Sequence, residues 1–155
     1  MLSHIDKKGN AKIVDISSKS ATNRIAVASG KIYVSSVVFN QIKKNINKKG
    51  DILNVARIAA IMASKNTSNL IPLCHPLKIE DINIEFLLEE TKGYIDIIIK
   101  VKCYEKTGVE MEALTATSIA LLTIYDMCKA IDKKMIISDI LLIEKKGGKK
   151  NTKIN

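Results

Sequence analysis

Residues 81–103 read DINIEFLLEETKGYIDIIIKVKC, which is the clearest strand pattern in the 155-residue chain. Apolar side chains at Ile82, Ile84, Phe86 and Leu88 alternate with polar ones, and a second alternating run starts at Ile95. Alternation with a period of two places the apolar side chains of each run on one face. A turn that ends at Gly93 separates the two runs, so the stretch predicts an antiparallel hairpin.

The segments on either side of this hairpin supply the remaining predicted elements. Before it we expect a short strand at 31–35, a helix at 36–46, and a second helix that starts after Asp51 and ends near Asn66. Asp51 follows a Lys-Lys-Gly turn and is placed to accept hydrogen bonds from the first turn of that helix. After the hairpin, the pattern predicts a long helix at 107–131 and a strand at 135–143.

The predicted order of elements is therefore β-α-α-β-β-α-β. Without the extra helix this is the split βαβ pattern of ferredoxin-like folds. We therefore expect an α+β fold, an antiparallel sheet with helices packed on one face plus an extra helix, in a single domain covering 1–155. Residues 1–26 have no clear period and predict an extended arm, and 146–155, rich in Gly and Lys, predict a mobile tail.

Composition limits the possible classes of protein. The chain is 46% hydrophobic, without an apolar run of membrane-spanning length or a signal-peptide pattern, which indicates a cytoplasmic protein. Three widely spaced cysteines do not form a disulfide framework. Cys74 and His75 are adjacent, but there is no second close Cys/His pair, so we expect neither a metal site nor a cofactor.

The net charge of +9 comes almost entirely from lysines, since Arg24 and Arg57 are the only arginines. Two readings remain open: a basic surface that binds nucleic acid through its phosphates, or lysines that converge on the phosphates of a small substrate. Aromatic residues make up 4% of the chain and there is no Trp, which weakens the reading as an RNA-binding ferredoxin-like module.

The long helix carries most of the charged candidates. Glu110 lies three residues after Thr107, so it fits a capping box as well as a site, whereas Glu112 has no capping explanation. Asp126 and Lys129 are spaced i, i+3 and share a face with apolar side chains. An exposed ion pair is the ordinary explanation, but an apolar surrounding favours a pair that is buried or lies in a pocket.

Two further candidates come from loops. His75 lies between Pro72 and Pro76, so it belongs to a stiff, extended loop of the kind that often carries site residues. Lys49 lies at a predicted helix start, where backbone N–H groups and a cation together attract phosphate. Either residue can also be purely structural or solvated.

Three long motifs carry a resemblance to a known family: LIPLCHPL at 70–77, KTGVEMEALTA at 106–116 and TIYDMCKA at 123–130. Weaker matches are VDIS at 14–17, Arg24 and KGD at 49–51. The chain resembles the cyclic pyranopterin monophosphate synthases, the C proteins of molybdenum-cofactor biosynthesis, from His4 to Lys149. It departs from the family at 145–148, where KKGG stands in place of KSGG.

The resemblance implies a lyase that acts on a triphosphorylated small molecule, 3′,8-cyclo-7,8-dihydroguanosine triphosphate, supplied by a partner radical enzyme. The products are cyclic pyranopterin monophosphate and pyrophosphate. It also implies a homohexamer, a trimer of dimers with sites between subunits, and no nucleic-acid or membrane partner.

The same resemblance assigns roles residue by residue. Asp126 is the principal acid–base residue, supported by Lys129 and Lys49. The substrate site is lined by Leu73, Cys74, His75, Met111 and Glu112, and Arg24, Lys65 and Lys145 contact phosphates or close the pocket. Because Glu112 and Asp126 are about 21 Å apart along one helix, we expect each site to take them from two chains.

Overall fold

The computed structural model describes residues 3–44, 51–148 and 151–153. The helices are α1 (Ser36–Lys43), α2 (Ile52–Lys65), α3 (Thr67–Leu70) and α4 (Glu110–Cys128), with a short 3-10 turn, η1, at Glu90–Lys92. The strands are β1 (Thr22–Tyr33), β2 (Ile79–Glu89), β3 (Tyr94–Glu105), β4 (Ile136–Lys146) and β5 (Thr152–Lys153). In this part of the chain, no helix is both long and apolar enough to cross a membrane.

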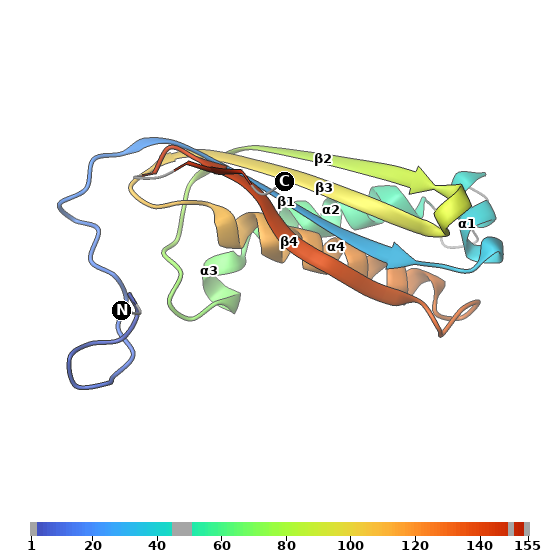
Figure 1. Ribbon diagram of the computed structural model, residues 1–155, viewed down its shortest axis with the longest axis horizontal. Helices are drawn as coiled ribbons and strands as arrows, with labels where there is room; N and C mark the ends of the chain where they lie inside the picture. Colours follow the sequence, from blue (N-terminus) through green and yellow to red (C-terminus); the bar gives the residue numbers. More distant parts are fainter. Residues whose placement is uncertain (1–2, 45–50, 149–150, 154–155) are drawn as a thin grey trace.

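The strands form one antiparallel sheet in the order β2-β3-β1-β4-β5 (Figure 1). The predicted hairpin is confirmed as β2 and β3, joined by η1 and by Gly93 in the left-handed conformation. Leaving β5 aside, the order of the four long strands is that of a split βαβ unit, so the ferredoxin-like α+β prediction is confirmed.

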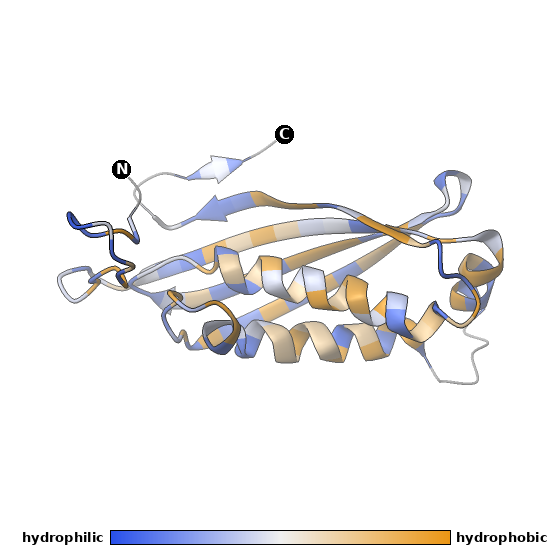
Figure 2. Cartoon of the chain, turned by 90° about the horizontal axis from the view of Figure 1, so that it is seen from below, coloured by the Kyte–Doolittle hydropathy of each residue, from blue (hydrophilic) through white to orange (hydrophobic). Residues whose placement is uncertain are grey.

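Helices α2 and α4 lie side by side along one face of the sheet (Figure 2). Asp51 caps α2 as predicted, and its side chain accepts a hydrogen bond from the backbone N–H of Asn54. The core lies between this helical layer and the sheet, where the alternate side chains of β3 from Ile95 to Cys103 are fully buried. Burial of these β-branched side chains stabilises both layers through the hydrophobic effect.

Strand β1 is longer than the short strand predicted at 31–35. It starts at Thr22, so the last residues of the predicted arm belong to the centre of the sheet. In the middle of β1 the helix-facing residues are small, because α4 lies close above them: a Cβ atom on Gly30 would lie 2.8 Å from Cδ1 of Leu121. Ala26, Ala28 and Gly30 are all buried there, and small residues do not produce the alternation typical of strands.

The start of α4 also differs from the sequence expectation. The helix begins at Glu110 after Val109, and no side chain caps it, so the predicted capping box of Thr107 and Glu110 is wrong. The Glu110 carboxylate instead forms an ion pair with Lys145 at the end of β4, with 3.0 Å between Nζ of Lys145 and Oε1 of Glu110. This pair ties the last long strand to the first turn of α4.

Candidate functional site

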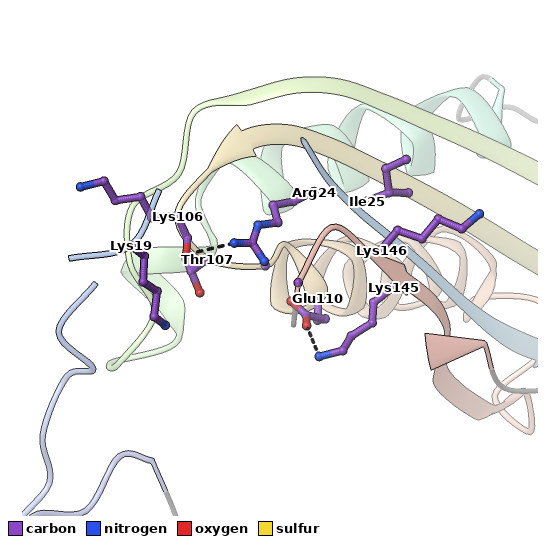
Figure 3. A pocket seen from close by; sticks show the side chains of 10 residues that line it. Lys19, Arg24, Ile25, Lys106, Thr107, Glu110, Lys145 and Lys146 are labelled. Atoms are coloured by element: carbon purple, nitrogen blue, oxygen red, sulfur yellow. Dashed lines mark hydrogen bonds and ion pairs between the residues drawn. The ribbon is translucent and has the colours of Figure 1, made fainter. Parts of the chain in front are cut away.

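Two adjoining cavities lie at the end of the molecule where β1 begins, β3 and β4 end, and α4 starts. The first, which we name the cationic cavity, has a volume of 260 Å³. Five positively charged residues line it, with one acidic residue, Glu110. Figure 3 shows that Lys145 points toward Glu110 and Lys146 points away from it, and the Lys146 ammonium pairs with Glu144 at 2.7 Å. The cations are Lys19, Arg24, Lys106, Lys145 and Lys146.

Hydrogen bonds to the backbone hold two of these cations in place. On β1, the Arg24 guanidinium donates to the carbonyl of Glu105 at 3.2 Å and to that of Lys106 at 3.3 Å, across to the end of β3. Nζ of Lys106 donates to the carbonyl of Ser17 at 3.0 Å. Preorganised cations around one small cavity form a site for a multiply charged anion such as a polyphosphate.

The second cavity, the Cys74–His75 cavity, has a volume of 370 Å³. The loop between α3 and β2 lines it with Leu73, Cys74, His75 and Leu77, and the first turn of α4 adds Met111 and Glu112. The segment before β1 contributes another wall with Ser3, His4, Val14 and Lys19. This cavity therefore combines apolar surface with groups that can exchange protons.

Glu112 is the most perturbed acid of the site. It is 3% exposed although it lines the Cys74–His75 cavity. Burial raises its pKa from 4.5 to about 7, and the nearby Glu110 carboxylate adds to the rise. A carboxyl group that titrates near neutral pH can both donate and accept a proton under working conditions.

Cys74 behaves differently in the same cavity. Burial, and next the charge of Glu112, raise the pKa of its thiol above the usual value. A thiol with a raised pKa stays protonated at neutral pH, and the thiolate is the nucleophilic form. Cys74 is therefore a wall of the cavity that can donate a weak hydrogen bond, and it is not an activated nucleophile.

The two cavities share a wall made of Lys19, Thr107, Gly108 and Glu110. A Cβ atom on Gly108 would lie 1.9 Å from a carboxylate oxygen of Glu110, so a larger residue there would displace the Glu110 side chain from this wall. A ligand with an anionic tail and a polar ring can therefore occupy both cavities at once.

The structure brings together seven of the residues expected in the site. These are Arg24 and Lys145 in the cationic cavity and Leu73, Cys74, His75, Met111 and Glu112 in the Cys74–His75 cavity. Lys65 lies elsewhere, at the end of α2, in a shallow apolar hollow with Met62, Leu70 and Ile119. Lys49 lies outside the described residues.

Asp126 and Lys129 lie at the opposite end of α4 from Glu112. They form a 2.6 Å ion pair whose side chains are 67% and 56% exposed, and the hydrogen bond that the Lys129 ammonium donates to the Asp126 carboxylate raises the pKa of Lys129. The expectation that the pair is buried or in a pocket is therefore wrong for the single chain. The physical reason is the orientation of α4. Its buried side carries Ala113, Ala120 and Ile124, whereas the pair projects on the outer side beside exposed Leu122.

Sequence reasoning did not assign a site role to three residues of the two cavities, His4, Lys19 and Lys106. His4 and Lys19 lie in the aperiodic segment before β1, and Lys106 is one of many lysines. Only the fold brings them to the site. Among the described residues, no group of three or more His, Cys, Asp or Glu side chains is arranged to hold a metal ion.

Comparison with known proteins shows to which family the chain belongs. The model of the MoaC family matches residues 13–148. A cyclic pyranopterin monophosphate synthase of Clostridium perfringens is 56% identical over 148 residues, covering 96% of this chain and 94% of that protein. Proteins of the same name from Heliobacterium modesticaldum and Campylobacter jejuni are 53% and 54% identical, again covering 96% of this chain and 93% and 94% of their own lengths. The chain therefore belongs to the MoaC family.

Proposed function

We propose that this chain is a cytoplasmic cyclic pyranopterin monophosphate synthase, a lyase in an early step of molybdenum-cofactor biosynthesis. Its substrate is 3′,8-cyclo-7,8-dihydroguanosine triphosphate, made by a radical enzyme, and its second product is pyrophosphate. Relatives of this name match nearly the whole chain. The observation that carries the proposal is the contact between a cationic cavity and a cavity that contains a carboxyl group titrating near neutrality.

The cationic cavity suits the triphosphate. In the proposed reaction a substrate oxygen attacks the α-phosphorus, the bond from that phosphorus to the β-phosphate oxygen breaks, and pyrophosphate leaves with the bonding electrons. Lys19, Lys106 and Lys145 supply positive charge where negative charge builds up on the leaving group. Arg24, held by two carbonyl groups, adds a fixed guanidinium on the same wall.

The Cys74–His75 cavity suits the fused rings. One ring must open and another close, which requires several proton transfers and no net oxidation or reduction. Glu112 and His75 face the same cavity and can carry protons between ring positions. Leu73 and Met111 provide apolar surface against which planar rings can pack.

We also propose that a second chain completes each site, within a homohexamer arranged as a trimer of dimers. Asp126, with Lys129, lies fourteen residues from Glu112 on α4, about 21 Å at the helical rise of 1.5 Å per residue. A single nucleotide is too small to reach from the Cys74–His75 cavity to that pair within one chain.

The surroundings of the pair support this arrangement. Leu122, Ile58 and Met62 are 53%, 57% and 60% exposed on the outer side of the helical layer. Contact with another subunit removes such apolar surface from water. We propose that this contact brings Asp126 and Lys129, together with Lys65, to a neighbouring chain's cavities.

The direct test is to incubate the purified protein with the cyclised dihydro-GTP and to measure pyrophosphate and cyclic pyranopterin monophosphate together. The expected result is one pyrophosphate for each cyclic product. GTP serves as the matched control, because it carries the same triphosphate without the bond between carbon 8 and the ribose, and it should release none. A well-folded protein that forms neither product excludes the proposal.

Subunit mixing tests the two-chain site. Asp126→Ala and Glu112→Ala variants, each inactive, are unfolded and refolded together in equal amounts. If each site takes the two residues from different chains, about one quarter of the sites regain both. Each of the two chains at a site has an even chance of carrying the intact residue, and the two chains are incorporated independently. If both residues act within one chain, the mixture stays inactive although mass spectrometry detects hybrid oligomers.

A further inference from the structure

We infer that residues 3–19 form a lid over the Cys74–His75 cavity and that His4 on this lid contacts the bound substrate. The inference rests on the proposed function and extends it to a residue with no role in the reasoning above. The segment leaves the start of β1 and runs outside the layer of sheet and helices, at the same end as the loop between α3 and β2 (Figure 1). Ser3, His4 and Val14 of this segment face that loop across the cavity.

The tip of the segment has a defined shape. The Asp6 carboxylate accepts hydrogen bonds from the backbone N–H groups of Lys8 and Asn10, both at 2.8 Å, and these bonds lower its pKa. The backbone N–H of Lys12 donates to the carbonyl of His4 at 2.9 Å, next to a β-bridge between Ile5 and Ala11. These contacts fix the backbone of His4 at the mouth of the cavity.

The base of the segment is tied to the cationic cavity. The Lys106 ammonium donates to the carbonyl of Ser17, whose own N–H donates to the Asp15 carboxylate at 2.8 Å. Lys19 lines both cavities. Phosphates bound in the cationic cavity therefore attract Lys19 and Lys106, the cations that hold the base of the lid. Binding of the phosphate tail thus favours closure of the lid over the ring end of the ligand in the Cys74–His75 cavity.

A purely structural role for the segment does not account for these contacts. None of its described apolar side chains belongs to the buried core, and Ile5 and Ile13 are 44% and 47% exposed. The chain has two histidines, and both line this one cavity, His75 from the loop and His4 from the lid. An imidazole can donate one hydrogen bond and accept another, which suits the polar edge of a fused-ring substrate.

The experiment compares steady-state kinetics of the full-length wild type with His4→Ala, His4→Gln and, as a matched control, Lys7→Ala. Lys7 is exposed in the same tip but does not line the cavity. With the cyclised dihydro-GTP as substrate, we expect His4→Ala to lower kcat/KM by about fivefold or more, the loss of one or two hydrogen bonds. His4→Gln should recover part of this loss, because its amide still donates and accepts, and Lys7→Ala should match the wild type.

Hydrogen exchange of residues 3–19, measured during turnover with excess substrate, gives a second readout. Substrate should slow exchange of this segment in the wild type, and less so in His4→Ala. A kcat/KM of His4→Ala within twofold of the wild type, or exchange that substrate leaves unchanged in the wild type, overturns the inference. If the wild type itself does not turn the substrate over, the proposed function fails instead.

Discussion

Replacing Glu112 by Gln should make the protein more stable at alkaline pH and remove part of its pH dependence. Glu112 is 3% exposed, and its pKa rises from 4.5 to about 7 on folding. Such a rise corresponds to about 3 kcal/mol of difference between the two protonation states. The buried carboxylate is therefore the costly form, and Gln keeps the shape of the side chain without the charge.

The sign follows from proton binding. Below pH 4.5 the carboxyl group is protonated in both the folded and the unfolded chain, and its raised pKa has no effect on stability. Between pH 4.5 and 7 the unfolded chain releases the proton while the folded chain keeps it, so the free energy of unfolding falls as pH rises. Above pH 7 the loss is complete, at about 3 kcal/mol.

The assay is urea unfolding of the wild type and of Glu112→Gln from pH 4 to pH 8.5, at one protein concentration because oligomer stability depends on it. The difference in the free energy of unfolding should grow with pH in favour of the variant and level off above pH 7. Glu85→Gln is the control, since Glu85 is exposed on β2. A constant difference between Glu112→Gln and the wild type across this range would refute the reasoning.

Three further predictions concern catalysis, metal and packing. Asp126→Ala should lose turnover of the cyclised dihydro-GTP but keep the wild-type circular dichroism spectrum, since its side chain is 67% exposed; near-wild-type turnover contradicts its catalytic role. Activity should survive a zinc chelator, because among the described residues none completes a ligand set with Cys74 and His75; rescue of a chelated, inactive protein by zinc alone contradicts this. Gly30→Val should lower the free energy of unfolding by about 1–3 kcal/mol through overpacking against Leu121, whereas Ser29→Val on the opposite face of β1 should change it far less.

The sequence predicted the elements in which one physical signal dominates. The hairpin of β2 and β3 follows from alternation of β-branched residues with charged ones, and the start of α2 follows from the Asp51 cap. The alternation of side chains does not predict most of β1. Ala26, Ala28 and Gly30 are small because α4 packs closely on them, and this tertiary contact leaves no local pattern in the sequence.

The site divides in the same way. Motifs placed Cys74, His75 and Glu112 in one site, and the structure brings them to one cavity. The environment of Asp126 was mispredicted, because a helical period says which residues share a face but not whether another part of the chain covers that face. His4 reaches the cavity through the turn held by Asp6 and the bridge between Ile5 and Ala11, and no periodicity encodes such a path.

Helix α4 makes the chain unusually intolerant of changes in length at its middle. One inserted residue turns everything after it by about 100° and moves it by about 1.5 Å. Such an insertion would rotate Ile124 and Cys128 out of the core and swing Asp126 away from its present direction relative to Glu112. Natural variation in chain length should therefore be excluded from the nineteen residues of α4.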